Sequence, residues 1–488
     1  MHYKEMEMAL VTAADSAIAQ YPEINKNTAY AQRPSPNRKS KGPGLRLSWP
    51  YASDGRRSVV GKSPPVVQPH KNGSRRASDM RIVHVSYENV EMHYHFSDLG
   101  PTESARPILH IPLAWNPSDL EVGEKNLFQY FQCTAAQSLA TFGYNPGDLS
   151  GVLIRVALAG HTTSATAVLQ SLLAFSSIHR HDVHSQAVEL KISALKALAA
   201  AAGNPVGTVE AVQHVAAGML LCSFEIHQSS CTSSQWTWYL SGVKDVIKAA
   251  GLGRSPQDND LAILLDWVYY HDVLARFTLR HWHKESNAVT SAVSNARAEV
   301  SHAAPSAFSV IQLLSDVCDA VSARSVAGQP FENIDDHKSF LKILDWRIRS
   351  IPLEAIVCDS TDASLMIELY QLAMLVYLNR ASENLLSQTT KTQHQIDKAF
   401  SIFSQLDSCD RQFPIFILGC EARGDDQRAI ILDLITKTEK KASSRSFNYV
   451  KILLQAIWAQ DDLANGHINY CDKLNYVISC CAIVPSFV

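Results

Sequence analysis

The sequence predicts an all-α protein, a large irregular antiparallel helical array behind a disordered basic N-terminal arm. Apolar residues make up 46% of the 488 residues and charged residues 19%, as in ordinary globular proteins. From about residue 121 onward, apolar positions recur at three- and four-residue spacing, which is typical of helices with one buried face. Lys and Arg side chains are concentrated in the residues that precede that region.

Residues 1–80 form the predicted arm. Between Arg33 and Arg81, twelve Lys and Arg side chains stand against two Asp side chains, a local balance of +10 in a chain whose formal charge is −3. The stretch is rich in Pro, Gly and Ser and buries too little apolar surface to offset the entropy of ordering. It favours a polyanion partner or a nuclear-import signal, with a solvated tail as the alternative. The candidate contacts to nucleic-acid phosphates or an import receptor are Arg38, Lys39, Lys41 and Arg46.

Residues 81–120 are predicted as an irregular connecting segment with short extended pieces, and residues 121–488 as the helical body. The predicted helices cover residues 161–178, 185–202, 208–226, 236–250, 260–282, 306–323, 334–349, 362–386, 391–406, 425–441, 445–464 and 472–482. Short Gly, Pro, Ser and Asp turns between them fit antiparallel neighbours. No 34-residue repeat is present, so a solenoid is the second choice.

The composition allows inferences about the cellular location of the protein and about metal binding. No apolar run approaches the ~18 residues that cross a bilayer, so no membrane partner is expected. Lys4, Glu5 and Glu7 precede no apolar stretch, which argues against a secretory signal and for an intracellular protein. The ten cysteines are scattered and form no CxxC, so we expect small buried hydrophobes and no structural metal site.

Two histidine groups are candidates for chemistry. His179, His181 and His184 could ligate a metal, but they fall in a predicted inter-helix turn, where such short spacing rarely gives tetrahedral geometry. His281 and His283 lie at a predicted helix end, where an imidazolium would interact favourably with the helix dipole. Both groups are therefore interpreted as structural.

Two polar clusters in the helical body are better explained as links between helices than as catalytic groups. Adjacent side chains point to different sides of a helix, so His271 and Asp272 form no catalytic pair with each other. The members of the clusters are Asp266, His271, Asp272, Glu421, Arg423, Asp425, Asp426 and Arg428. No GxGxxG, GxxxxGK[ST], HExxH or GxSxG motif occurs, so we predict no enzyme, no catalytic residue and no cofactor site.

Several segments resemble the fungal-specific transcription factor domain, the helical region that follows a six-cysteine zinc cluster in fungal regulators. They are GPGLRLSWP (42–50), SQWTWYLSGVKDVIKAAG (234–251), LLDWVYYHDVLARF (264–277), FPIFILGCEARGDDQR (413–428) and YVISCCAIVPSFV (476–488). In that family a zinc cluster lies just upstream of the first segment. Here no cysteine precedes Cys133, so the chain as given forms no binuclear cluster, and zinc belongs to full-length relatives.

The resemblance implies a nuclear regulator of RNA polymerase II transcription. Its partners would be promoter DNA, reached directly or through another protein, the transcription machinery or co-regulators, and a second chain in a homodimer or heterodimer. Without the zinc module, the arm supplies only phosphate contacts, which are indifferent to sequence. One alternative is a helical protein-interaction scaffold or dominant-negative partner of related factors. Another is a small-molecule sensor or enzyme, which a deep polar pocket would favour.

Overall fold

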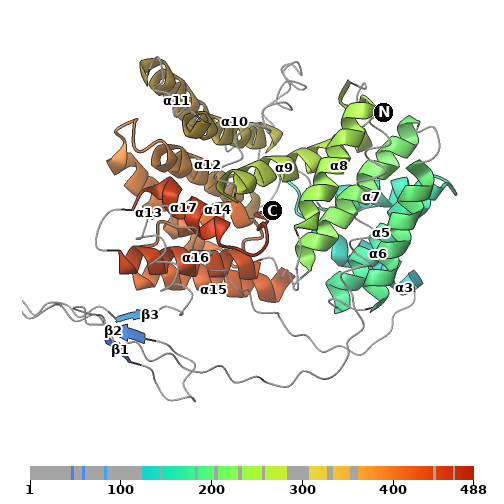
Figure 1. Cartoon of the computed structure of the whole chain (residues 1–488), viewed down its shortest axis with the longest axis horizontal. Coiled ribbons are helices and arrows are strands. Elements are labelled where there is room, and N and C mark those ends of the chain that lie inside the picture. Colours follow the sequence, from blue (N-terminus) through green and yellow to red (C-terminus); the bar gives the residue numbers. More distant parts are fainter. Residues whose placement is uncertain are drawn as a thin grey trace, which may run out of the picture.

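The computed structural model shows an all-α body preceded by three short strands (Figure 1). It describes residues 46–48, 58–60, 82–84, 124–142, 146–181, 185–202, 207–228, 234–254, 259–282, 307–326, 334–351, 361–442, 447–464 and 468–488. Most of the predicted arm and connecting segment lies outside these residues. The prediction that the arm is disordered concerns that part of the chain and stays a prediction.

The strands form a small antiparallel sheet in the order β1-β2-β3. They are β1 (Arg46–Ser48), β2 (Ser58–Val60) and β3 (Ile82–His84), with Val59 opposite both Leu47 and Val83. β3 lies against helix α16 of the body. Extended structure was expected near β3 but not in the arm, because a strand depends on partners distant in sequence that local composition does not reveal.

The first half of the body is a layered bundle with its own core. Its elements are α3 (Glu124–Cys133), η1 (Ala135–Ser138), α4 (Pro146–Leu158), α5 (Thr163–His181), α6 (Ser185–Ala202), α7 (Thr208–His227), α8 (Gln235–Ala249) and η2 (Leu252–Arg254). α5 packs along α6 and α7, and α7 packs along α8. Phe131, Phe175, Phe224 and Trp236 are among its largest buried side chains.

Helix α7 is the most enclosed element of this half. Within the described residues it is the one helix long and apolar enough to cross a membrane, but 78% of the apolar window is buried inside the protein. Its composition is therefore that of a core helix. At Gly218 a Cβ atom would lie 2.5 Å from Cγ2 of Val243 on α8, so the missing side chain lets the two helices approach closely.

Helix α9 (Asn259–Trp282) joins the two halves of the body (Figure 1). Leu264 and Trp267 in its first turns belong to the core of the first half. Tyr270 and Phe277, further along, belong to the core of the second half. One continuous helix of 24 residues therefore contributes to both cores.

The second half contains eight described helices. They are α10 (Ala307–Val326), α11 (Ile334–Arg349), α12 (Thr361–Ala381), α13 (Thr389–Gln405), α14 (Gln412–Gly419), α15 (Asp425–Ala442), α16 (Phe447–Leu463) and α17 (Tyr470–Ser479). All eight residues of α14 are buried. The ring of Phe277 on α9 lies edge-on to Phe413 of α14, with 5.2 Å between centroids.

The last residues of the sequence connect the halves a second time. The Trp236 indole in α8 donates a hydrogen bond to the Val484 carbonyl, 2.9 Å away, and the Val484 amide donates to the Ser234 hydroxyl. Four residues later, the Gln412 amide of α14 donates to the Val488 carbonyl at 2.7 Å. Phe487 between them is buried beside Phe416.

The predicted helices are confirmed, and most ends agree within four residues. Three helices were missed, namely α3, α4 and α14. α4 begins with Pro and carries two Gly residues, and α14 is apolar on every side, so neither shows the spacing of an amphipathic helix.

Candidate functional site

The structure does not assemble the predicted nucleic-acid contacts into a site. Arg38, Lys39 and Lys41 lie outside the described residues. Arg46 begins β1, where the backbone alone is described. Their role in binding phosphates or an import receptor stays a prediction.

Metal-binding groups can be sought only in the described part of the chain. No group of three or more His, Cys, Asp or Glu side chains there is placed to hold a metal ion. His179 lies in the last turns of α5, not in a turn between helices, and its Nδ1 is 3.0 Å from the Tyr130 hydroxyl. Six of the eight described cysteines are buried, as expected of small hydrophobes.

His281 corrects the expectation of an imidazolium at a helix end. The side chain is 1% exposed, and burial, followed by the nearby Arg280 charge, lowers its pKa to about 3. Nδ1 lies 2.6 Å from the Asn475 amide oxygen and Nε2 lies 2.9 Å from the Tyr377 hydroxyl. The amide oxygen only accepts, so Nδ1 carries the proton and Nε2 accepts from Tyr377. The ring is therefore a neutral bridge between α9, α12 and α17.

The interpretation of charged clusters as links between helices is confirmed at three positions. Asp272 on α9 pairs with Lys244 on α8 at 2.7 Å. Glu421, after α14, pairs with Arg380 on α12 at 2.8 Å. Arg428 on α15 pairs with Asp462 on α16 at 2.6 Å, and its guanidinium lies over the Trp458 ring. Each pair joins two elements and so orients one against the other.

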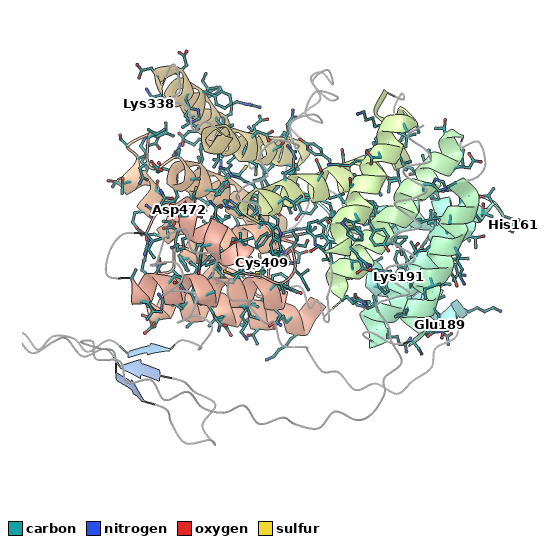
Figure 2. All side chains as sticks on the ribbon, in the orientation of Figure 1. His161, Glu189, Lys191, Lys338, Cys409 and Asp472 are labelled. Atoms are coloured by element: carbon teal, nitrogen blue, oxygen red, sulfur yellow. The ribbon has the colours of Figure 1, made fainter. Side chains whose placement is uncertain are left out.

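A more deeply buried ion pair was missed by the sequence analysis. Lys191 on α6 (labelled in Figure 2) lies 2.6 Å from Glu225 on α7, and the two side chains are 6% and 1% exposed. Lys191 also donates to the Gln235 amide oxygen and lies over the Phe224 ring. Residues 34 positions apart show no spacing that could have revealed this pairing.

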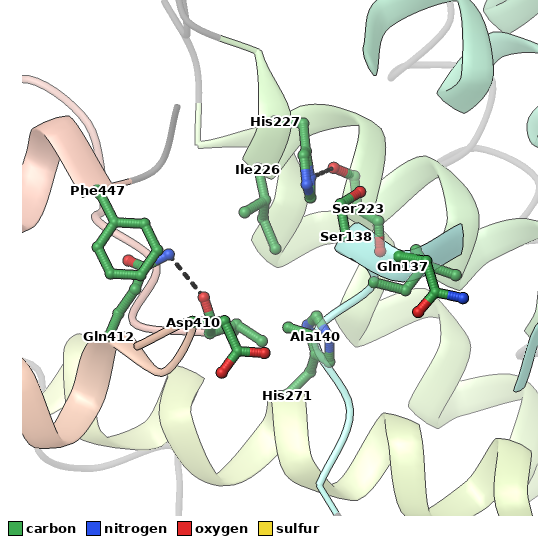
Figure 3. Close-up of a pocket in the computed structure, with 12 residues that line it drawn as sticks. Gln137, Ser138, Ala140, Ser223, Ile226, His227, His271, Asp410, Gln412 and Phe447 are labelled. Atoms are coloured by element: carbon green, nitrogen blue, oxygen red, sulfur yellow. Dashed lines mark hydrogen bonds between the residues drawn. The ribbon is translucent and has the colours of Figure 1, made fainter. Parts of the chain in front are cut away.

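A small cavity with both polar and apolar lining residues lies where the two halves meet (Figure 3). Its polar side chains include Ser138 after α3, His227 at the end of α7, His271 on α9, and Asp410 and Gln412 at the start of α14. Together with Phe447 of α16 and Val488, these residues bring six segments that are distant in sequence to the cavity. Two of its lining side chains, His227 and His271, have lowered pKa values.

Two histidines with lowered pKa values line the cavity. His271 is 2% exposed, and burial lowers its pKa to about 3 although the ring lies against the Ala140 backbone. Burial also lowers the pKa of His227, whose Nδ1 lies 2.9 Å from the Ser223 carbonyl and donates to it. The His271 ring lies against the backbone of Ala140, in the segment after η1, and the interpretation of His271 as a link between neighbouring helices stays a prediction. Burial keeps the ring neutral where it lines the cavity.

The size of the cavity decides what it accommodates. Its volume of about 40 Å³ has room for about two or three water molecules. Pockets for drug-sized ligands have roughly 300–1,000 Å³. The Ser138 hydroxyl donates to the Ala135 carbonyl, so no histidine activates it as a nucleophile. In this conformation the cavity is large enough for water-sized molecules and too small for a drug-sized effector.

The comparisons with known proteins define the class. The model of the family described as "Fungal specific transcription factor domain" matches residues 126–481, which span nearly the whole helical body. The chain therefore belongs to the fungal-specific transcription factor domain family, whose members are transcription factors and not enzymes.

A similar protein is also named as a transcription factor. The chain is 50% identical over 386 residues to a protein named transcription factor iacI of Pestalotiopsis fici (strain W106-1 / CGMCC3.15140), a match that covers 78% of this chain and 100% of the relative. No solved structure matches the chain. The family match and this relative together make the protein a transcriptional regulator.

Proposed function

We propose that the protein acts in the nucleus on RNA polymerase II transcription, with its helical body as a docking platform for co-regulators and with promoter DNA reached through a partner protein. The observation that carries the proposal is the family match over residues 126–481, because it covers the body from α3 to α17. The sequence contains no CxxC and no cysteine before Cys133. The residues given therefore hold no ligand set for a binuclear zinc module, and the proposal assigns the sequence-specific DNA contacts to a partner.

The first test separates docking from DNA binding. The full chain is fused to a heterologous DNA-binding domain and tethered at a fungal reporter promoter, and transcript is measured with and without the fusion. The proposal expects the tethered chain to change transcription several-fold, while the untethered chain does nothing at the same reporter. A tethered chain that is stably expressed and leaves transcription unchanged would contradict it.

The second test addresses the arm. The full chain carrying Arg38, Lys39, Lys41 and Arg46 all changed to Gln is compared with the unchanged chain as fluorescent fusions and in DNA binding at several salt concentrations. Four phosphate contacts give a slope of log affinity against log salt of about −3.6 at most. We expect the variant to lose nuclear accumulation or to flatten that slope. Equal localisation together with an equal slope would remove these residues from the proposal.

The missing zinc ligands also favour a second function, in which the chain antagonises related zinc-cluster factors by pairing with them. Co-expression with such a factor distinguishes the two. An antagonist lowers promoter occupancy by the factor, whereas a co-regulator platform leaves occupancy unchanged and alters transcript. Occupancy of the promoter by both proteins would support the first proposal.

A further inference from the structure

The segment after α17 passes from one core of the body to the other and back. Residues 482–488, which we call the strap, form neither helix nor strand. They follow α17, which packs in the core of the second half. Val484 then lies in the core of the first half, and Phe487 and Val488 lie again in that of the second. The strap therefore connects the two halves independently of α9.

Hydrogen bonds from both halves reach the strap. In the first half, the Trp236 indole N–H donates to the Val484 carbonyl at 2.9 Å, and the Val484 amide donates to the Ser234 hydroxyl at 3.1 Å. In the second half, the Gln412 side-chain amide donates to the Val488 carbonyl at 2.7 Å (dashed in Figure 3). Each half therefore contributes side chains that bind the main chain of the strap.

Phe487 is the apolar anchor of the strap. Its side chain is fully buried, and its ring centroid lies 4.5 Å from that of Phe416 and 5.4 Å from that of Phe277. Buried aromatic rings make some of the largest single contributions to packing. We therefore expect Phe487 to contribute most to keeping the strap closed.

Among the described elements, few others join the halves. α9 alone of the described helices packs along helices of both halves. Phe142, in the segment before α4, adds contacts with the rings of Tyr270 and Tyr370, whose centroids are 5.8 and 4.7 Å away. Beside these contacts lies the cavity, which Val488 of the strap helps to line. Halves joined by limited contacts are expected to move relative to each other unless something restrains them.

The strap should open more readily than the helices around it. None of its residues forms a backbone–backbone hydrogen bond with the described part of the chain. Segments with few main-chain hydrogen bonds open at a lower free energy than core helices do. Opening the strap breaks the contacts of Val484, Phe487 and Val488 but dissolves no helix or strand. Both cores can therefore stay folded when the strap is open.

We propose that the strap restrains the two halves of the body in one relative orientation, and that it opens as a unit while both cores stay folded. An open strap lets the halves turn about α9 and exposes the walls of the cavity. A partner that contacts both halves then binds the closed and the open form with different affinities, so the strap adjusts how the body meets other proteins. The inference goes beyond the proposed function and is independent of it, because strap opening is measured without DNA or a partner.

Hydrogen exchange of the full chain, followed by NMR, tests the opening. The Val484 amide proton and the Trp236 indole proton both form hydrogen bonds in the contact between strap and first half, so one opening exposes both. In the unchanged chain we expect these two strap protons to have similar protection factors. Their protection should be roughly tenfold or more below that of amides in the middle of α7, because those exchange only when the core unfolds.

Two matched Phe→Ala variants separate strap opening from unfolding of the whole chain. Phe487→Ala removes the anchor and should lower the protection of both strap protons about a hundredfold. Phe403→Ala is the control, because Phe403 is 2% exposed and packs against Phe400 of the same helix, α13. It should lower the protection of core amides and leave the strap protons unchanged, since its packing is the same whether the strap is closed or open.

A distance measurement tests the restraint on orientation. Keto amino acids at Trp238 on α8 and Ile343 on α11, both 57% exposed, carry spin labels, and pulsed EPR measures the distance between the halves. Phe487→Asp puts a carboxylate at a fully buried position and should release the strap, which broadens the distance distribution while circular dichroism stays helical. Ala482→Asp adds the same charge at an exposed strap position and should keep the narrow distribution.

Four results would each overturn the proposal. The first is a pair of strap protons as well protected as the core amides, and the second is an equal loss of their protection in Phe403→Ala and Phe487→Ala. The third is an unchanged distance distribution in Phe487→Asp. The fourth is a Phe487→Asp chain that loses its helical circular dichroism, because the cores then do not stay folded without the strap.

Discussion

Acid should destabilise the helical body through His281, and the size of the effect follows from its surroundings. The neutral ring bridges Asn475 and Tyr377 and is 1% exposed. Replacing it in His281→Gln keeps a neutral hydrogen-bonding group while removing the group that titrates. His161→Gln, at an exposed position before α5, is the control.

The sign and magnitude follow from the two pKa values. Burial holds the pKa of folded His281 at about 3, against about 6.5 in the unfolded chain. Between these values the unfolded state binds more protons, so the contribution is fully present above pH 6.5 and is lost as pH falls towards 3. A pH of 5 lies about 1.5 units below the unfolded pKa, and each unit corresponds to about 1.36 kcal/mol. Protonation of His281 in the unfolded chain therefore lowers the free energy of unfolding by about 2 kcal/mol at pH 5 relative to pH 7.5.

Urea unfolding at pH 7.5 and at pH 5 measures this contribution. His281→Gln lowers stability at pH 7.5 because the bridge is imperfectly replaced, but its decrease between the two pH values should be about 2 kcal/mol smaller than that of the unchanged chain. His161→Gln should keep the full decrease. An unchanged pH dependence in His281→Gln would show that the ring is not held neutral by burial, and the reasoning would fail.

Two further predictions concern packing and charge in the first half. Gly218→Ala should cost about 1–3 kcal/mol in the free energy of unfolding, since its Cβ would meet Val243, and adding Val243→Ala should restore part of that loss. Lys191→Met should lower the free energy of unfolding by about 3–5 kcal/mol, because it leaves the Glu225 carboxylate buried without its cation. The double variant that also carries Glu225→Leu should have a free energy of unfolding within about 1 kcal/mol of that of the unchanged chain. Urea titrations check both, and a double variant no more stable than its single variant would contradict either one.

The elements that could be predicted from the sequence are those with a local cause. The helix at 185–202 was predicted with both ends correct, because Ala and Leu have high helix propensity and the apolar positions recur at helical spacing. The family resemblance was likewise carried by short segments, and the match over residues 126–481 confirms it. The charge balance of the arm is a property of composition alone.

Other features depended on which surfaces packing brought together. α14 lacks helical periodicity because it is buried on every side, and the sheet pairs strands whose partners lie elsewhere in the sequence. His281 was predicted to be charged because it stands at a helix end, yet it is neutral because α12 and α17 cover it.

By itself, then, the sequence determined the helical class, the positions of most helices and the family, since these depend on spacing and composition within about twenty residues. Only the tertiary structure decided that Lys191 is buried against Glu225, that His271 faces a cavity and that Trp346 on α11 stays exposed. The physical reason is that burial and pairing depend on what lies across from a side chain. Contacts in this helical body join residues as far apart in sequence as Trp236 and Val484. The neighbour of a buried side chain is therefore determined by packing and not by the adjacent sequence.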